Sequence, residues 1–194
     1  MTPVRASNSL TPVVARGAIG GMIAGMAMAI FAMVASVTYQ HHGFFTPLFH
    51  ISALFGSPKS MMISVHEAMA GHRFWFAAGP AFVGLLIHML TGAAYGIAFA
   101  VVARRLHRRA LVPAGMVFGL GTFFVSSFVG LRIAATITGA GTTISDMAKM
   151  VGWPTFALEH LMFGLVLGAL ALGRSRATSR ADSSSGVRSA MLVS

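Results

Sequence analysis

The sequence of 194 residues contains no cysteine, so it offers no disulfide, no thiolate metal ligand and no cysteine nucleophile. It is also poor in charge: 9% of its residues are charged and four are acidic, whereas soluble domains usually carry about 25% charged residues. Four carboxylates are too few to supply the polar surface that a soluble domain of this length needs. With 56% hydrophobic residues, the sequence predicts that lipid is the solvent for most of the chain.

The motifs of common enzyme sites are missing as well. The sequence has no GxSxG, HExxH or Walker motif, and the acids that lie near a histidine are Glu67 and Glu159. A GxG at 119–121 lies inside an apolar stretch, where a phosphate group would not bind. We therefore expect a protein that is not an enzyme.

Four long apolar stretches are present instead, at about 17–39, 75–103, 112–138 and 153–173. Each is long enough to cross a hydrocarbon core about 30 Å thick, and Trp75 and Trp153 open two of them as interfacial anchors. The predicted fold is an all-α polytopic membrane protein with four transmembrane helices. A cleaved signal peptide is the alternative for the first stretch, although signal peptides usually have an apolar core of about 7–15 residues.

The basic residues lie mostly at the ends of these stretches. Ten of the fourteen are Arg5, Arg16, Arg104, Arg105, Arg108, Arg109, Arg174, Arg176, Arg180 and Arg188, whereas the other two connections hold Lys59, Arg73 and Lys149. Basic residues favour the cytoplasmic side, which predicts a multi-pass protein of the cell's inner (plasma) membrane with both termini in the cytoplasm and loops 40–74 and 139–151 outside. The arginine clusters would contact anionic lipid, so the net charge of +10 does not indicate nucleic-acid binding.

The remaining segments complete the predicted organisation. Residues 1–16 are expected to be a disordered cytoplasmic arm, residues 17–174 the four-helix membrane domain, and residues 175–194 a disordered basic tail. Loop 40–74 is expected at the outer membrane interface, with a short helix that starts at Ser57-Pro58 and runs through Ala70.

An internal repeat relates the two halves of the predicted membrane domain. Each half has a GxxxG stretch followed by an HxxxGxxxG stretch: Gly21 and Gly25 with His88, Gly92 and Gly96, then Gly115 and Gly119 with His160, Gly164 and Gly168. Spacing of four residues places these side chains on one face of a helix, and small residues let a second backbone approach. We therefore expect two repeated helical hairpins. The glycine faces would pack within one chain or between copies in a homo-oligomer or larger membrane complex.

One stretch resembles a known family. The run HMLTGAAYGIAFAVVARRL, followed by PAGMVFGLG, resembles the YagU-like four-helix bacterial inner-membrane proteins of unknown function over about 80 residues. The resemblance implies a four-span inner-membrane protein and brings no reaction, cofactor or site residue with it.

Four ionisable residues lie within the predicted spans, where charge is costly. Arg132 and Glu159 are each six residues from the same membrane boundary, which corresponds to a depth of about 9 Å. Equal depth predicts a buried ion pair. Such a pair would fix helix register or, alternatively, would belong to a proton or ion pathway.

His88 and His160 occupy matching positions in the repeat and form the candidate intramembrane site, with Gly92 and Gly164 one turn away. Two structural histidines that hydrogen-bond to neighbouring helices are one interpretation. Axial ligation of haem b, with the glycines making room, and proton handling are the alternatives.

The long loop contains histidines and methionines, whose nitrogen and sulfur atoms suit copper. Met62, His66 and Met69 are predicted to share a helix face, and His41 and His42 would add ligands. The alternative is that the methionines are apolar contacts. Taken together, the sequence predicts a non-enzymatic accessory subunit or small transporter-like module that needs no cofactor. A haem b- or copper-binding redox membrane protein is the alternative.

Overall fold

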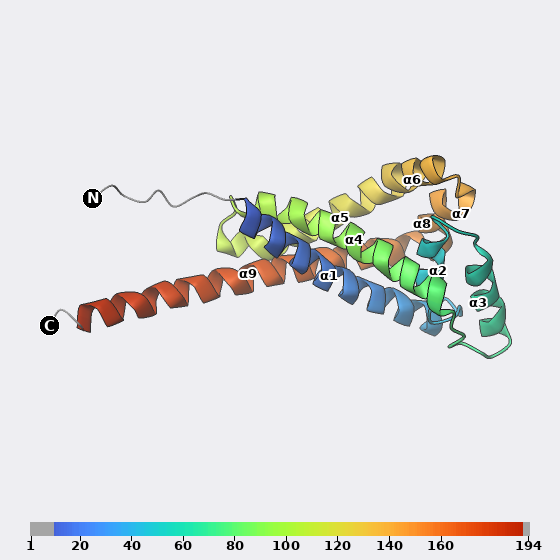
Figure 1. The fold of residues 1–194 in the computed structure, drawn as a ribbon, viewed down its shortest axis with the longest axis horizontal. Helices are drawn as coiled ribbons and strands as arrows, with labels where there is room; N and C mark the ends of the chain where they lie inside the picture. Colours follow the sequence, from blue (N-terminus) through green and yellow to red (C-terminus); the bar gives the residue numbers. More distant parts are fainter. Residues whose placement is uncertain (1–9, 192–194) are drawn as a thin grey trace.

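The computed structural model describes the backbone of residues 10–191 and the side chains of residues 10–174. This part of the chain is built from helices (Figure 1), and it has no strand. The helices are α1 (Thr11–Thr38), α2 (Thr46–Ser52), α3 (Lys59–Met69), α4 (Ala78–Ala103), α5 (Leu111–Val125), α6 (Leu131–Thr138), α7 (Gly141–Ser145), α8 (Met147–Val151) and α9 (Trp153–Met191). A 3₁₀ turn, η1 (Arg108–Ala110), precedes α5, and a π-helical turn, η2 (Ser126–Gly130), joins α5 to α6.

Four of these segments are long and apolar enough to cross a membrane: Thr11–Thr38, Ala78–Ala103, Arg108–Thr138 and Trp153–Arg174. The chain is therefore a polytopic helical membrane protein, and the predicted four-helix fold is confirmed. The helices run alternately up and down (Figure 1), with the loop between α4 and α5 near the start of α1 at one end. We call this the arginine end, and the opposite end, which holds α2, α3, α7 and α8, the loop end.

Glycines create close helix contacts within each hairpin. In the first hairpin, α1 and α4, Gly21 lies against the backbone of Gly92; in the second, α5 to α6 and α9, Gly115 lies against that of Gly164. A Cβ atom at Gly92 would stand 2.8 Å from the Gly21 carbonyl oxygen, closer than side chains tolerate. The predicted glycine faces therefore join the two helices of each hairpin, as small residues do in membranes.

The two hairpins meet mainly through α1 and α9. Ala24 of α1, Phe99 of α4, and Phe163 and Leu167 of α9 form a buried cluster between them. At the arginine end, the guanidinium of Arg174 donates a hydrogen bond of 2.9 Å to the carbonyl of Arg16. Contact between α4 and α5 is much less extensive.

The loop between α1 and α4 is folded onto the loop end of the bundle. Helix α2 packs on α4, where Gly84 lies against the carbonyl of Leu48, and Phe49 is fully buried against Trp75. Helix α3 packs on α2 through a hydrogen bond of 2.8 Å between the hydroxyls of Thr46 and Ser64. Helix α2 is therefore packed between α3 and α4, and the position of this loop at the outer membrane interface stays a prediction.

Three segment boundaries differ from those predicted. Helix α1 begins at Thr11, so only residues 1–9 of the predicted arm lie outside the described residues. Helix α4 begins at Ala78, after Trp75. Helix α9 continues to Met191 through the tail that was predicted to be disordered. Extending an existing helix requires no new nucleus.

Candidate functional site

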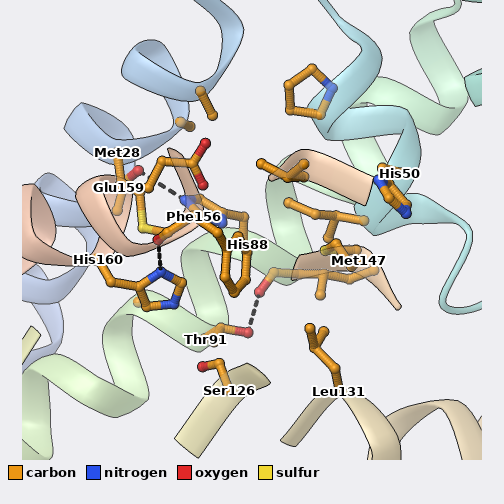
Figure 2. A pocket seen from close by; sticks show the side chains of 18 of the residues that line it. Met28, His50, His88, Thr91, Ser126, Leu131, Met147, Phe156, Glu159 and His160 are labelled. Carbon is orange, nitrogen blue, oxygen red and sulfur yellow. Dashed lines mark hydrogen bonds between the residues drawn. The ribbon is translucent and has the colours of Figure 1, made fainter. Parts of the chain in front are cut away.

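A cavity of about 310 Å³ lies between the two hairpins near the loop end. Both hairpins contribute to its wall: α1, α2 and α4 from the first, and η2, α6, α7, α8 and α9 from the second. We call it the central cavity. Figure 2 shows side chains around it, with His88, Glu159 and His160 grouped in one part of the view and His50 on α2 in another.

Glu159 is the acidic residue of this cavity. It lies on α9, is 5% exposed, and has no hydrogen bond or ion pair with any residue that the structure describes. A buried carboxylate without a compensating cation costs several kcal/mol. Glu159 must therefore hold a proton or face a cation.

The predicted ion pair between Arg132 and Glu159 is not formed. Arg132 lies on the exposed face of α6, and the ion pair found among the described residues joins His72 to Glu67 at 2.8 Å. The physical reason is the π-helical turn η2, just before α6. An extra residue in a turn rotates the following side chains by about 100°, so equal depth no longer implies facing positions.

His88 and His160 both line the central cavity, as the sequence predicted, but their hydrogen bonds differ. His88 donates from Nε2 to the carbonyl of Gly25 on α1 at 2.9 Å. His160 donates from Nδ1 to the carbonyl of Phe156 on its own helix at 2.7 Å and packs between the rings of Phe156 and Phe123. Each ring has one nitrogen satisfied by backbone, which leaves its other nitrogen as an acceptor in the neutral form.

The two glycines of the predicted site face in different directions. Gly92 lines the central cavity and also contacts α1, whereas Gly164 lies against Gly115 and Gly119 of α5 and does not line the cavity. The glycines therefore serve helix contacts and do not open a shared cleft. The room that a haem would need between the histidines is not supplied by these positions, and Nε2 of His88 is already bound to a carbonyl.

A second cavity of about 380 Å³ lies next to the first at the loop end, and we call it the loop-end cavity. The two cavities share the wall residues Gln40, Pro47, His50 and Val151. Gln40 donates to the carbonyl of Val151 at 2.8 Å, and His50 donates to that of Thr143 at 2.7 Å. These two hydrogen bonds tie the loop of the first hairpin to α7 and α8 at the boundary between the cavities.

Burial lowers the pKa of His50 below its ordinary value of 6.5. The carbonyl of Thr143 opposes this effect, and nearby His42 adds to it by charge repulsion. The pKa of His42 is also lowered, by burial and then by His41. Both rings, which line the loop-end cavity, are therefore held in their neutral form.

The predicted copper ligands are not gathered at one place. Met62, His66 and Met69 are exposed on one face of α3, as expected, and His41 is exposed elsewhere on the loop. His42 and Met62 both line the loop-end cavity. Within the described ranges, no three His, Asp or Glu side chains are grouped as metal ligands.

Several cavity residues were not recognised from the sequence. Tyr95 of α4 meets Ser126 of η2 at 3.2 Å between their hydroxyls and so crosses from one hairpin to the other. His50 stands within the apolar run PLFHISALF, and a single histidine in such a run is a signal that could have identified it. For Ser126 no such signal exists, because its position depends on a π-helical turn.

No family model matches this chain, and no match was found among curated proteins or among solved structures.

Proposed function

We propose that this chain is a small, non-enzymatic, transporter-like membrane protein that takes a small ligand into its central cavity. One observation carries the proposal: the cavity is lined by both hairpins and adjoins a second cavity at the loop end across Gln40 and His50. Sites between helices of a bundle are common positions for small-molecule binding. A helical accessory subunit that served only to pack against a partner would not need such a space.

The proposal includes the position in the cell that the distribution of arginines predicts. The arginine end, with Arg104, Arg105, Arg108 and Arg109, faces the cytoplasm of a bacterial inner membrane and contacts anionic lipid. Both cavities then lie toward the outer side of the membrane. A ligand would reach His50 from the loop-end cavity and pass Gln40 into the central cavity.

Thiol labelling tests whether water reaches the central cavity, because the natural chain has no cysteine. Ser126→Cys places a thiol on the cavity wall, and Val125→Cys places one on the adjacent, 51% exposed position, which faces lipid. A membrane-impermeant maleimide added from the loop end should label Ser126→Cys and leave Val125→Cys unlabelled. After denaturation both variants should react fully.

The opposite result is equally clear. If Ser126→Cys resists the reagent in the folded protein as strongly as Val125→Cys does, the cavity is closed to solutes. The transporter-like function would then be rejected in favour of an accessory subunit.

A further inference from the structure

Among the described residues, the lining of the central cavity contains one acidic side chain and no lysine or arginine. Glu159 is 95% buried, since its exposed fraction is 5%, and it lines the cavity without a partner among the described residues. No described Lys or Arg lines the cavity, and Arg132, its expected partner, is exposed on α6. No described lysine or arginine of the cavity wall therefore supplies the counter-charge for this carboxylate.

The histidines around the cavity do not supply the missing charge. His50, His88 and His160 each donate one ring N–H to a backbone carbonyl. None of the three makes an ion pair with Glu159. A neutral imidazole satisfied in this way needs no carboxylate beside it. Either a proton on Glu159 or a cation that enters the cavity must balance the carboxylate.

The rest of the wall suits an apolar ligand body. It includes Met28, Ile87, Tyr95, Met147, Phe156 and Phe163. Three of these are aromatic, and aromatic faces attract organic cations. The volume of about 310 Å³ lies at the lower end of the range of small-molecule sites, which is about 300–1,000 Å³.

From this combination we propose that the central cavity binds a lipophilic organic monocation, such as an aryl-alkyl amine or ammonium ion, with the Glu159 carboxylate as its counter-charge. The inference rests on the proposed function, because it requires a cavity that admits a ligand. The apolar body fills the space between the hairpins, and the cationic group lies against Glu159. In the empty protein a proton occupies the carboxylate, so cation and proton compete for one group.

Two probes of equal shape separate the charge from the apolar body. Benzyltrimethylammonium is a monocation, and neopentylbenzene is its uncharged carbon isostere. Binding of each to the full chain in lipid nanodiscs is measured by calorimetry, with empty nanodiscs as the blank. We expect the wild-type protein to bind the cation at least about tenfold more tightly than the isostere, because a buried charge pair and the aromatic wall both favour it.

Variants assign the preference to Glu159. Glu159→Gln keeps the shape of the side chain and should abolish the preference for the cation while leaving neopentylbenzene bound. Glu67→Gln, which changes the acid that pairs with His72 on α3, should leave both affinities unchanged. Should Glu159→Gln not fold, the wild-type preference still decides, together with Glu159→Asp, which should retain it.

Other results would overturn the proposal. If the isostere binds the wild-type protein as tightly as the cation, the ligand is not cationic, but the cavity still accepts ligands and the proposed function stands. If the cation keeps its advantage in Glu159→Gln, the counter-charge lies elsewhere. If neither probe binds and Ser126→Cys is also closed to maleimide, both this inference and the proposed function are wrong.

Discussion

Gly119 and Gly121 are separated by one residue on α5, yet a methyl group would meet very different surroundings at the two positions. At Gly119 it would overlap the carbonyl of His160 and lie 3.0 Å from the Cα atom of Gly164, whereas nothing lies within 4 Å at Gly121. Gly119→Ala should therefore destabilise the second hairpin by about 1–3 kcal/mol, since overpacking forces the helices apart. Gly121→Ala should be neutral or stabilising by up to about 1 kcal/mol, because alanine favours a helix.

The two single variants are compared by thermal unfolding in the same detergent. They differ only in the position of one added carbon on the same helix, so each is the control for the other. Equal melting temperatures would mean that the close approach of α5 and α9 does not contribute to stability.

His50 makes the loop end sensitive to pH. Its pKa is lowered in the folded protein by burial, so the unfolded chain takes up a proton at a higher pH than the folded chain. The stability that the neutral ring provides is complete above the ordinary pKa near 6.5 and decreases as the pH falls toward the folded pKa. We expect the melting temperature of the wild-type protein to be lower at pH 5 than at pH 7.5.

His50→Gln retains a donor for the carbonyl of Thr143 and removes the titration. The difference between the melting temperatures at pH 5 and at pH 7.5 should be smaller in this variant than in the wild-type protein. The exposed His66 on α3 provides the matched change, and His66→Gln should leave the difference as it is in the wild type. An unchanged pH response in His50→Gln would show that other groups cause it.

At single residues, sequence reasoning singled out three residues of the central cavity but not their contacts. It identified Glu159, His88 and His160, because an ionisable group in an apolar stretch is detectable by composition alone, and all three line the cavity. It paired Arg132 with Glu159 because both residues lie at the same depth in the membrane. Two side chains must also face each other to pair, and the face on which each lies depends on the helical turns before it. The two histidines share a cavity, but their hydrogen-bond partners depend on which backbone carbonyl is nearest.

Among the elements, α2 has the most unusual position. It lies at the loop end of the central cavity, and Pro47, Leu48 and His50 contribute to the wall. Its contact with α4 depends on Gly84, where a Cβ atom would overlap the carbonyl of Leu48. Gly84→Ala should therefore displace α2 and increase the rate at which maleimide labels Ser126→Cys from the loop end.

Gly79 provides the control for this change. It lies five residues earlier at the start of α4, and nothing is within 4 Å of the position of its Cβ atom. Labelling of Ser126→Cys should proceed at the same rate with and without Gly79→Ala. A rate that is unaffected by Gly84→Ala would mean that α2 does not close the cavity.

The long helices were predictable because a membrane span leaves a clear signal, namely about 20 apolar residues between polar flanks. The α3 helix was predicted almost to the residue, since Ser57 accepts a hydrogen bond from the backbone N–H of Lys59 at its start. The burial of α2 was not predictable in the same way. Its position depends on tertiary contacts with α4, α3 and α1, which the run PLFHISALF does not reveal.

For the whole molecule, the structure places both loops at one end and the α4–α5 loop at the other, and the arginines predict which end is cytoplasmic (Figure 1). Reporter fusions after Arg109 should therefore report the cytoplasm, and insertions near Ser57 and Thr142 should report the outside. Moving the excess of basic residues from the arginine end to the loop end should weaken the preference for this orientation. An outside signal at Arg109 would reverse the orientation and with it the side from which a ligand enters.

The hydrogen bonds that hold the loop end also impose an order on synthesis. Tyr39, Gln40 and His50 donate to Thr155, Val151 and Thr143, partners that follow 116, 111 and 93 residues later in the chain. At an elongation rate of about 5–20 residues per second, the ribosome needs about 5–20 s to deliver these partners. During that interval the first hairpin is already in the membrane while its loop still lacks its acceptors. In an unfinished chain these three donors therefore remain without their native acceptors until the second hairpin has been made.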